Sequence, residues 1–169
     1  MLRLLTDDYF AFLRERLLAP VATLDILAYV INFQFYKKFY RSTQLFNLIL
    51  SSKNKGARVR LILDSSPQVS PNHRTNLFTA TKLKEHGFDV KMQTIPHPLH
   101  SKAFCFDSSL LVVGSHNLTQ SALTNPLEMS VATDDPLIVK NFLSIYDRLY
   151  GSPITAPWSR KLWRKSSTK

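Results

Sequence analysis

The chain contains two kinds of hydrophobic pattern. Short apolar runs, typical of buried β-strands, occupy residues 23–33, 58–64, 88–93, 103–106, 110–114 and 127–133. Apolar residues that recur every three to four positions, typical of surface helices, occupy residues 7–18, 44–56, 75–87 and 134–151. Because strands and helices alternate, the sequence predicts an α/β fold: a mixed β-sheet flanked by helices on both faces.

Proline and glycine mark several of the expected helix ends. Pro20 follows the first helical pattern, and Gly56 and Gly87 follow the second and third, where a glycine cap is common. Asp135 and Pro136 precede the last pattern and are typical of a helix N-terminus. We expect one catalytic domain over residues 1–152, followed by a proline-broken basic tail over residues 153–169.

The charge balance favours a polyanionic partner. The chain has 22 Lys and Arg residues against 12 Asp and Glu, a formal net charge of +10. Such a field attracts either nucleic acid or an anionic membrane surface. The candidate phosphate contacts are Arg58, Arg60, Arg74, Lys82, Lys84, Arg160, Lys161, Arg164 and Lys165. The aromatic run at residues 33–40 is a candidate for base stacking, although most of it is expected to continue a core strand.

Other features bear on the compartment. The only cysteine, Cys105, lies in an apolar strand and excludes a disulfide framework. Acidic residues appear too soon after the N-terminus to leave room for the apolar region of a secretion signal. No apolar run reaches the roughly 20 residues that span a bilayer. We therefore expect a cytoplasmic protein for which a membrane partner is not favoured.

Polar groups gather at the ends of the hairpin over residues 99–119. In the first strand His100 and Lys102 share one face, whereas Asp107 lies on the other face or in the turn. After the second strand Ser115 and Asn117 share a face, and an antiparallel pairing returns them to the side of His100. Gly114 allows a close approach of backbone or ligand.

This set of side chains suits a phosphate group. Lysine, serine and asparagine donate hydrogen bonds to phosphate oxygens, and a histidine can attack phosphorus or transfer a proton. By parity alone, a solvated strand edge is the better explanation of the same residues. The arrangement H-x-K-x4-D, a short strand and G-S-x-N resembles the signature of the phospholipase D superfamily, in particular its small bacterial endonucleases. It stands here as His100, Lys102, Asp107, Gly114, Ser115 and Asn117, with Glu128 as the following acidic residue.

The resemblance implies a phospholipase D-like fold and a metal-independent phosphodiesterase without a cofactor. One histidine attacks phosphorus to form a phosphohistidine, and a second histidine protonates the leaving oxygen and then activates water. Lys102, Ser115 and Asn117 would bind phosphate, Glu128 would orient a catalytic histidine, and Asp107 and Gly114 would be structural. Because the chain has one H-x-K motif and the mechanism needs two, a homodimer with a composite site is implied.

Three alternatives remain open from the sequence. A lipid phosphodiesterase with a cardiolipin-like substrate would use the basic tail, with Trp158, Leu162 and Trp163, as an interfacial helix. A non-catalytic nucleic-acid-binding subunit would keep the fold without the reaction. A metal site would need His97, His100, His116 and Cys105 together, which the opposite parity of His100 and Cys105 opposes.

The preferred hypothesis is that the protein is a weakly sequence-specific endonuclease acting on DNA or RNA. No sequence-reading motif is recognisable, so cleavage is expected to be weakly sequence-specific. Whether the protein works alone, in a larger defence or restriction assembly or with a sequence-reading partner is left open by the sequence. The polar segment 64–76 is a candidate for the entrance of the substrate groove. His116 is expected to turn away from the site and to be structural.

Overall fold

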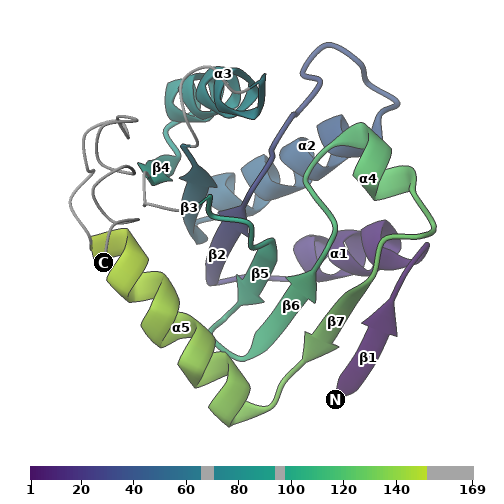
Figure 1. Cartoon of the computed structure of the whole chain (residues 1–169), viewed down its shortest axis with the longest axis vertical. Coiled ribbons are helices and arrows are strands. Elements are labelled where there is room, and N and C mark those ends of the chain that lie inside the picture. The colour runs from purple at the N-terminus through teal and green to yellow at the C-terminus, as the bar shows by residue number, and fades with distance from the viewer. Residues whose placement is uncertain (66–70, 94–97, 152–169) are drawn as a thin grey trace, which may run out of the picture.

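Seven strands form one mixed sheet in the computed structural model, which describes residues 1–65, 71–93 and 98–151 (Figure 1). The strands are β1 (Leu2–Leu5), β2 (Thr23–Ala28), β3 (Arg58–Asp64), β4 (Asp89–Gln93), β5 (Ala103–Phe106), β6 (Leu110–Gly114) and β7 (Ser130–Thr133). Their order is β1-β7-β6-β5-β2-β3-β4. The neighbours β2, β3 and β4 are parallel, and every other pair is antiparallel.

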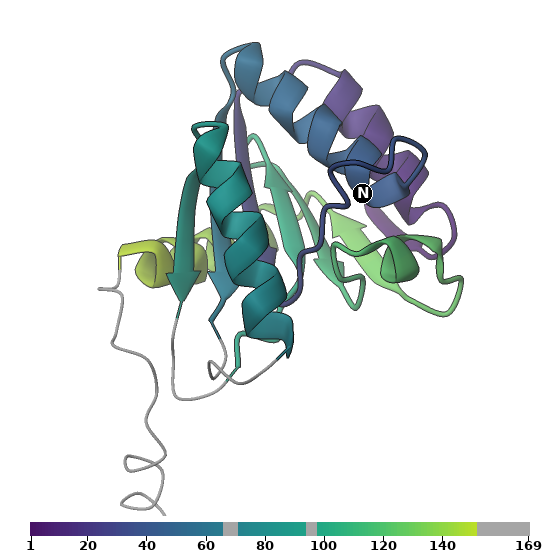
Figure 2. The same ribbon diagram turned by 90° about the horizontal axis from the view of Figure 1, so that it is seen from above.

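Helices cover both faces of this sheet, as the sequence predicts (Figure 2). The described helices are α1 (Tyr9–Leu18), α2 (Arg41–Asn54), α3 (Pro71–Glu85), α4 (Gln120–Thr124) and α5 (Pro136–Gly151). The larger core cluster joins the sheet to α1, α2 and α3, whereas α5 covers part of the opposite face. Strand β5 shows the alternation: Phe104 and Phe106 belong to the first cluster, and Ala103 and Cys105 to the second.

The helix ends follow local chemistry. The Asp135 carboxylate accepts hydrogen bonds from the backbone N–H groups of Leu137 and Ile138, so it caps α5 just before Pro136. Gly56 and Gly87 have φ values of 101° and 71°, which glycine adopts without strain, and both end their helices as expected. Gly151 is instead the last residue of α5.

The bounds of two expected elements were wrong, and two further elements were not expected. Strand β2 ends at Ala28 rather than at residue 33, because the chain leaves the sheet at Tyr29. Helix α3 begins at Pro71, so residues 71–76 of the expected groove entrance are helical, and residues 66–70 lie outside the described residues. Strand β1 and helix α4 were not expected, since four or five residues are too few to show a period. The basic tail at 153–169 also lies outside the described residues.

Candidate active site

The candidate site lies at the end of the sheet where β2 and β3 finish. Asn76, a buried residue of α3, accepts a hydrogen bond from Ile31 N–H and donates to the carbonyl oxygens of Tyr29 and Asp64. The Asp64 carboxylate accepts a hydrogen bond of 2.7 Å from Leu99 N–H. These bonds fix the segment before His100 against the ends of two parallel strands, a common place for sites in α/β proteins.

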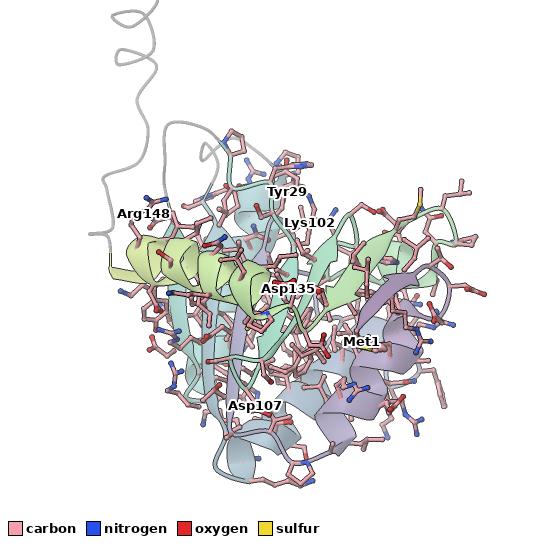
Figure 3. All side chains as sticks on the ribbon, turned by 90° about the horizontal axis from the view of Figure 1, so that it is seen from below. Met1, Tyr29, Lys102, Asp107, Asp135 and Arg148 are labelled. Atoms are coloured by element: carbon pink, nitrogen blue, oxygen red, sulfur yellow. The ribbon has the colours of Figure 1, made fainter. Side chains whose placement is uncertain are left out.

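His100 and Lys102 meet as their shared strand parity predicts. His100 is exposed, and its Nδ1 lies 3.2 Å from the Nζ of Lys102, which also donates to the His100 carbonyl oxygen at 2.6 Å. The Lys102 side chain is buried, with its ammonium 4.7 Å from the centre of the Tyr29 ring. The Tyr29 ring also contacts the imidazole of His100, at 4.3 Å between centroids. Figure 3 shows Tyr29 and Lys102 together at this end of the sheet.

Burial shifts the pKa of Lys102. Desolvation lowers the pKa of its ammonium, and the charge of Glu128 partly opposes this by raising it. The cation is therefore held in a poorly hydrated position, where its attraction for an incoming anion is stronger than at the surface. A phosphate oxygen bound beside His100 would offset the free-energy cost of desolvating the ammonium group.

The Lys102 contact fixes a tautomer of His100. An ammonium group has only hydrogens to donate, so Nδ1 accepts and a neutral imidazole carries its proton on Nε2. This tautomer can donate a hydrogen bond from Nε2, whereas a general acid needs both ring nitrogens protonated. Nucleophilic attack by Nε2 needs the proton on Nδ1 instead, and so requires Lys102 to turn away, for example towards a bound phosphate.

Gly114 brings the second strand close to the chain before β7. A Cβ atom at this position would lie 2.3 Å from both the Met129 carbonyl oxygen and the Ser130 Oγ, so any larger residue would clash. The close approach is to backbone, one of the two possibilities that the sequence left open. Next to it, the Ser115 hydroxyl donates to the Met129 carbonyl oxygen at 3.1 Å and accepts from Met129 N–H at 2.9 Å. The register of β5 and β6 pairs Ala103 with Val113 and so places Gly114 opposite Lys102. By strand parity Ser115 therefore lies on the other face from His100 and Lys102, and the expectation that the pairing returns it to their side was wrong. Ser115 must also exchange its bonds to Met129 before it can bind phosphate.

Asn117 has an unused polar atom. Within the described part of the chain its Oδ1 is buried without a hydrogen-bond partner, a costly condition in a folded protein. Turning the amide by 180° would place an NH2 donor in the same position, where a phosphate oxygen could accept from it. Glu128 is half-buried, and its charge acts to raise the pKa of Lys102 and of His116. Across residues 1–65, 71–93 and 98–151 no hydrogen bond joins Glu128 to His100.

Asp107 lies at the opposite end of the sheet from Lys102 (Figure 3). Asp107 and Ser108 have φ values of 51° and 53° in the turn between β5 and β6. The Asp107 carboxylate accepts hydrogen bonds of 2.7 and 2.8 Å from the N–H groups of Ala22 and Thr23. It therefore ties the hairpin turn to the start of β2, in keeping with the structural role expected from its parity.

His116 and Cys105 are packed away from the candidate site. His116 is buried, stacks on Tyr9 at 3.8 Å between ring centroids, and its Nδ1 lies 2.8 Å from the Ser130 Oγ. Burial lowers the pKa of its imidazole, although Glu128, the Thr6 backbone and Asp8 raise it. Burial also raises the pKa of the Cys105 thiol to about 11. Among the described residues no three His, Cys, Asp or Glu side chains are grouped as metal ligands, and His97 lies outside them.

The candidate phosphate contacts divide into three groups. Arg60 is committed to structure, because it makes two hydrogen bonds to the buried Asp25, at 2.7 and 2.8 Å, and an ion pair with Asp147. Its assignment as a phosphate contact was therefore wrong. Lys82 pairs with Glu85 at 2.8 Å on the surface, and Arg58, Arg74 and Lys84 are exposed. The tail residues 160, 161, 164 and 165, with the aromatics of 158–163, lie outside the described residues.

Tyr29 is the site residue that sequence reasoning missed. It was assigned to a core strand, yet it is the first residue after β2, and its ring contacts both His100 and Lys102. Asn76 and Asp64, which hold this segment, were not assigned either. A polar residue at the end of a buried parallel strand, as Asp64 is, was the available signal.

The fold is shared with two proteins of known structure. Nuc from Salmonella typhimurium, a phospholipase D family member, superposes with a TM-score of 0.70 at 15% identity, covering 89% of this chain and 93% of that one. NucT from Helicobacter pylori gives a TM-score of 0.70 at 16% identity, covering 92% and 99%. Identities this low show a common fold.

Sequence relatives extend the comparison. Mitochondrial cardiolipin hydrolase from Chlamydomonas reinhardtii is 27% identical over 128 residues, which are 76% of this chain and 51% of the relative. The human protein of the same name is 27% identical over 138 residues, or 82% and 49%. The chain thus spans about half the length of these curated relatives. Within the described residues no helix is both long and apolar enough to cross a membrane.

The family assignment rests on a match that covers most of the chain. The model of the family described as "Cardiolipin synthase, PLD-like domain" matches residues 21–150. The match begins two residues before β2 and ends one residue before the last residue of α5. This range contains both strands of the hairpin and every residue of the site described above. The chain therefore belongs to the PLD-like domain family, within the phospholipase D superfamily.

Proposed function

We propose that the protein is a metal-independent phosphodiesterase, and specifically an endonuclease of weak sequence specificity. The observation that carries this proposal is the pair formed by an exposed His100 and a buried Lys102 at the end of the sheet. A reactive imidazole beside a desolvated cation suits attack on a phosphodiester. The net charge of +10 favours a polyanionic substrate such as DNA or RNA.

The reaction proceeds in two displacements. Nε2 of one His100 attacks phosphorus, the bond from phosphorus to the leaving oxygen breaks, and a second histidine protonates that oxygen. Water then attacks the phosphohistidine, the second histidine takes the proton from this water, and the P–N bond breaks. Lys102 and the Asn117 amide bind the phosphate oxygens throughout, and Ser115 contributes once its hydroxyl leaves Met129.

The second histidine comes from a second copy of the chain. The uncovered half-sheet, which comprises β6, β7 and β1 on the face that no helix of the described residues covers, supports this homodimer (Figure 1). Val113, Val131 and Leu4 pair across these strands and so share a face, and Val113 and Leu4 are 39% and 60% exposed. The face adjoins Ser115 and Met129, so a copy packed there would bring its own His100 towards this site.

A lipid phosphodiesterase is the second candidate. Its support is the similarity to two mitochondrial cardiolipin hydrolases over 76% and 82% of this chain. The same residues would act on a phospholipid phosphodiester, since the displacement at phosphorus is common to both substrates. A nucleic-acid-binding subunit without catalysis, a cytoplasmic location and a larger defence or restriction assembly remain predictions.

A substrate panel in EDTA tests the proposal. Wild-type protein, His100→Ala and the matched control Ser101→Ala are incubated with single-stranded DNA, duplex DNA, RNA and cardiolipin vesicles. We expect cleavage of a nucleic acid by the wild type and the control, and at least a thousandfold loss in His100→Ala. Turnover of lipid alone would replace the nuclease with the second candidate. Full nuclease activity in His100→Ala would refute the mechanism.

A further inference from the structure

Two aromatic side chains stand almost fully exposed between β2 and α2. In the 34–40 loop, the segment Gln34–Tyr40, Tyr36 is 88% exposed and Phe39 is 91% exposed. The sequence favoured a core strand for this region, but only Phe33 is buried there, and the connection projects beyond α2 and α4 (Figure 1). The exposed Lys37 and Lys38 lie between the two rings in the sequence.

The loop is ordered by its own hydrogen bonds. Lys37 N–H donates to the Gln34 carbonyl oxygen at 2.8 Å, and Tyr40 N–H donates to the Lys37 carbonyl oxygen at 2.9 Å, which makes two consecutive turns. The Thr43 hydroxyl of α2 also donates to the Gln34 carbonyl oxygen, at 2.6 Å. The two exposed rings are therefore presented from a defined backbone.

Helix α3 extends the aromatic surface. Phe78 is 52% exposed, and its ring lies edge-on to Phe35 at 6.3 Å. A hollow of about 300 Å³ lies between Phe78 and residues 32–37, and another of about 420 Å³ lies within residues 36–40. Both hollows are lined by aromatic rings and lysines, which suits planar, negatively charged groups.

This surface is connected to the candidate active site by one stretch of chain. Tyr29 contacts His100, and two residues later Ile31 forms a bridge with Leu118. Asn32 N–H donates to the Leu118 carbonyl oxygen at 2.9 Å, next to Asn117. A polymer bound with one phosphodiester at His100 must continue over neighbouring surface, and the 34–40 loop begins there.

We propose that Tyr36 and Phe39, supported by Lys37, Lys38 and Phe78, form a stacking site for unpaired bases of a single-stranded nucleic acid. The inference rests on the proposed function, because it extends the path of a nucleic-acid substrate away from His100. Rings take up exposed bases by stacking, and the lysines attract the backbone between them. Paired bases in a duplex have no free faces, so this site distinguishes single strands from duplexes.

Binding measurements test the stacking site without cleavage. The full chain carrying His100→Ala, so that bound strands stay intact, is compared with the same protein carrying Tyr36→Ala and Phe39→Ala as well. The probes are a single-stranded oligonucleotide, its duplex, a strand of equal length made of abasic sites, and anionic phospholipid vesicles. Leu127→Ala with Leu137→Ala, at residues 83% and 67% exposed elsewhere, is the matched control.

We expect the loop variant to bind the single strand at least tenfold more weakly, with duplex and abasic affinities unchanged and the control pair unaffected. Replacement by other aromatics, Tyr36→Phe with Phe39→Tyr, should restore binding. Equal loss on the abasic strand, or no loss at all, would overturn the stacking site alone. So would a loss of binding confined to anionic vesicles, which would make the loop a membrane contact. Failure of the parent protein to bind any nucleic acid would overturn the proposed function as well.

Discussion

At the scale of single residues, Gly114 is the position most sharply constrained by space. A Cβ there would overlap Met129 and Ser130, whereas a Cβ at Gly151 would meet nothing within 4 Å. We predict that Gly114→Ala lowers the free energy of unfolding by about 1–3 kcal/mol, the usual cost of overpacking. Gly151→Ala, the matched control, should be neutral or slightly stabilising. Urea unfolding of both variants measures this, and equal stabilities would contradict the close packing.

His116 gives a prediction about pH. Because burial lowers the pKa of its imidazole in the folded protein, the unfolded chain binds the proton more readily. The stability contributed by a neutral His116 is therefore present above its ordinary pKa of 6.5 and is lost as the pH falls towards its folded pKa. We predict a fall in the free energy of unfolding between pH 7 and pH 5. His116→Phe, which keeps a ring against Tyr9, should reduce this slope, and an unchanged slope would exclude His116 as a source.

The sequence predicts which residues form the site better than it predicts the hydrogen bonds that those residues make. His100 and Lys102 meet as their parity requires, because a period of two fixes which side chains share a face. The bonds from Ser115 to Met129 depend on where β7 begins, which a four-residue strand does not reveal. Tyr29 was missed because the apolar run continues past Ala28, and only the tertiary contacts of Asn76 end the strand there.

At the level of elements, the hairpin of β5 and β6 has a structural contact at one end and the candidate site at the other. Asp107 fixes its turn to β2 at one end, and His100 precedes it at the other. We predict that Asp107→Ala lowers the free energy of unfolding by about 1–3 kcal/mol, since two backbone N–H groups lose their acceptor. The activity per folded molecule should not change.

Asp107→Asn is the conservative comparison. Asparagine tolerates a positive φ and keeps a side-chain oxygen for Ala22 and Thr23, so its effect should be clearly smaller. Thermal unfolding and kcat, measured on the same samples, separate the two properties. A large loss of kcat in a fully folded Asp107→Ala protein would contradict the structural role.

Most of the periodic segments were predictable, including the short strands β5 and β6, whereas β1, α4 and the start of α3 were not. The strands β3 and β4 and the helices α1, α2 and α5 lie close to their predicted bounds, because each shows its period over several residues. The first turn of α3 lies in a polar, proline-containing segment, so its start at Pro71 was not recognised. Proline is tolerated at this position, because the N–H group that it lacks would have no partner within the first turn of the helix.

At the scale of the whole molecule, the uncovered half-sheet predicts how two copies meet. Leu4→Glu places a charge on this face, whereas Leu18→Glu places one at the end of α1, at a residue of similar exposure, 54% against 60%. We predict that Leu4→Glu shifts the protein to monomers and abolishes activity, while Leu18→Glu leaves both unchanged. Sedimentation velocity and cleavage assays measure the two effects. A dimeric, active Leu4→Glu protein would place the interface elsewhere.

The composite-site mechanism requires His100 from two chains at each site. Co-expression with two affinity tags yields a dimer with one wild-type chain and one His100→Ala chain, which is purified through both tags. Its cleavage rate is compared with that of the wild-type dimer at equal concentration, before subunits exchange. The composite site predicts a loss of at least a thousandfold, because either the nucleophile or the acid is missing. Half of the wild-type rate would contradict it and would mean that each chain works alone.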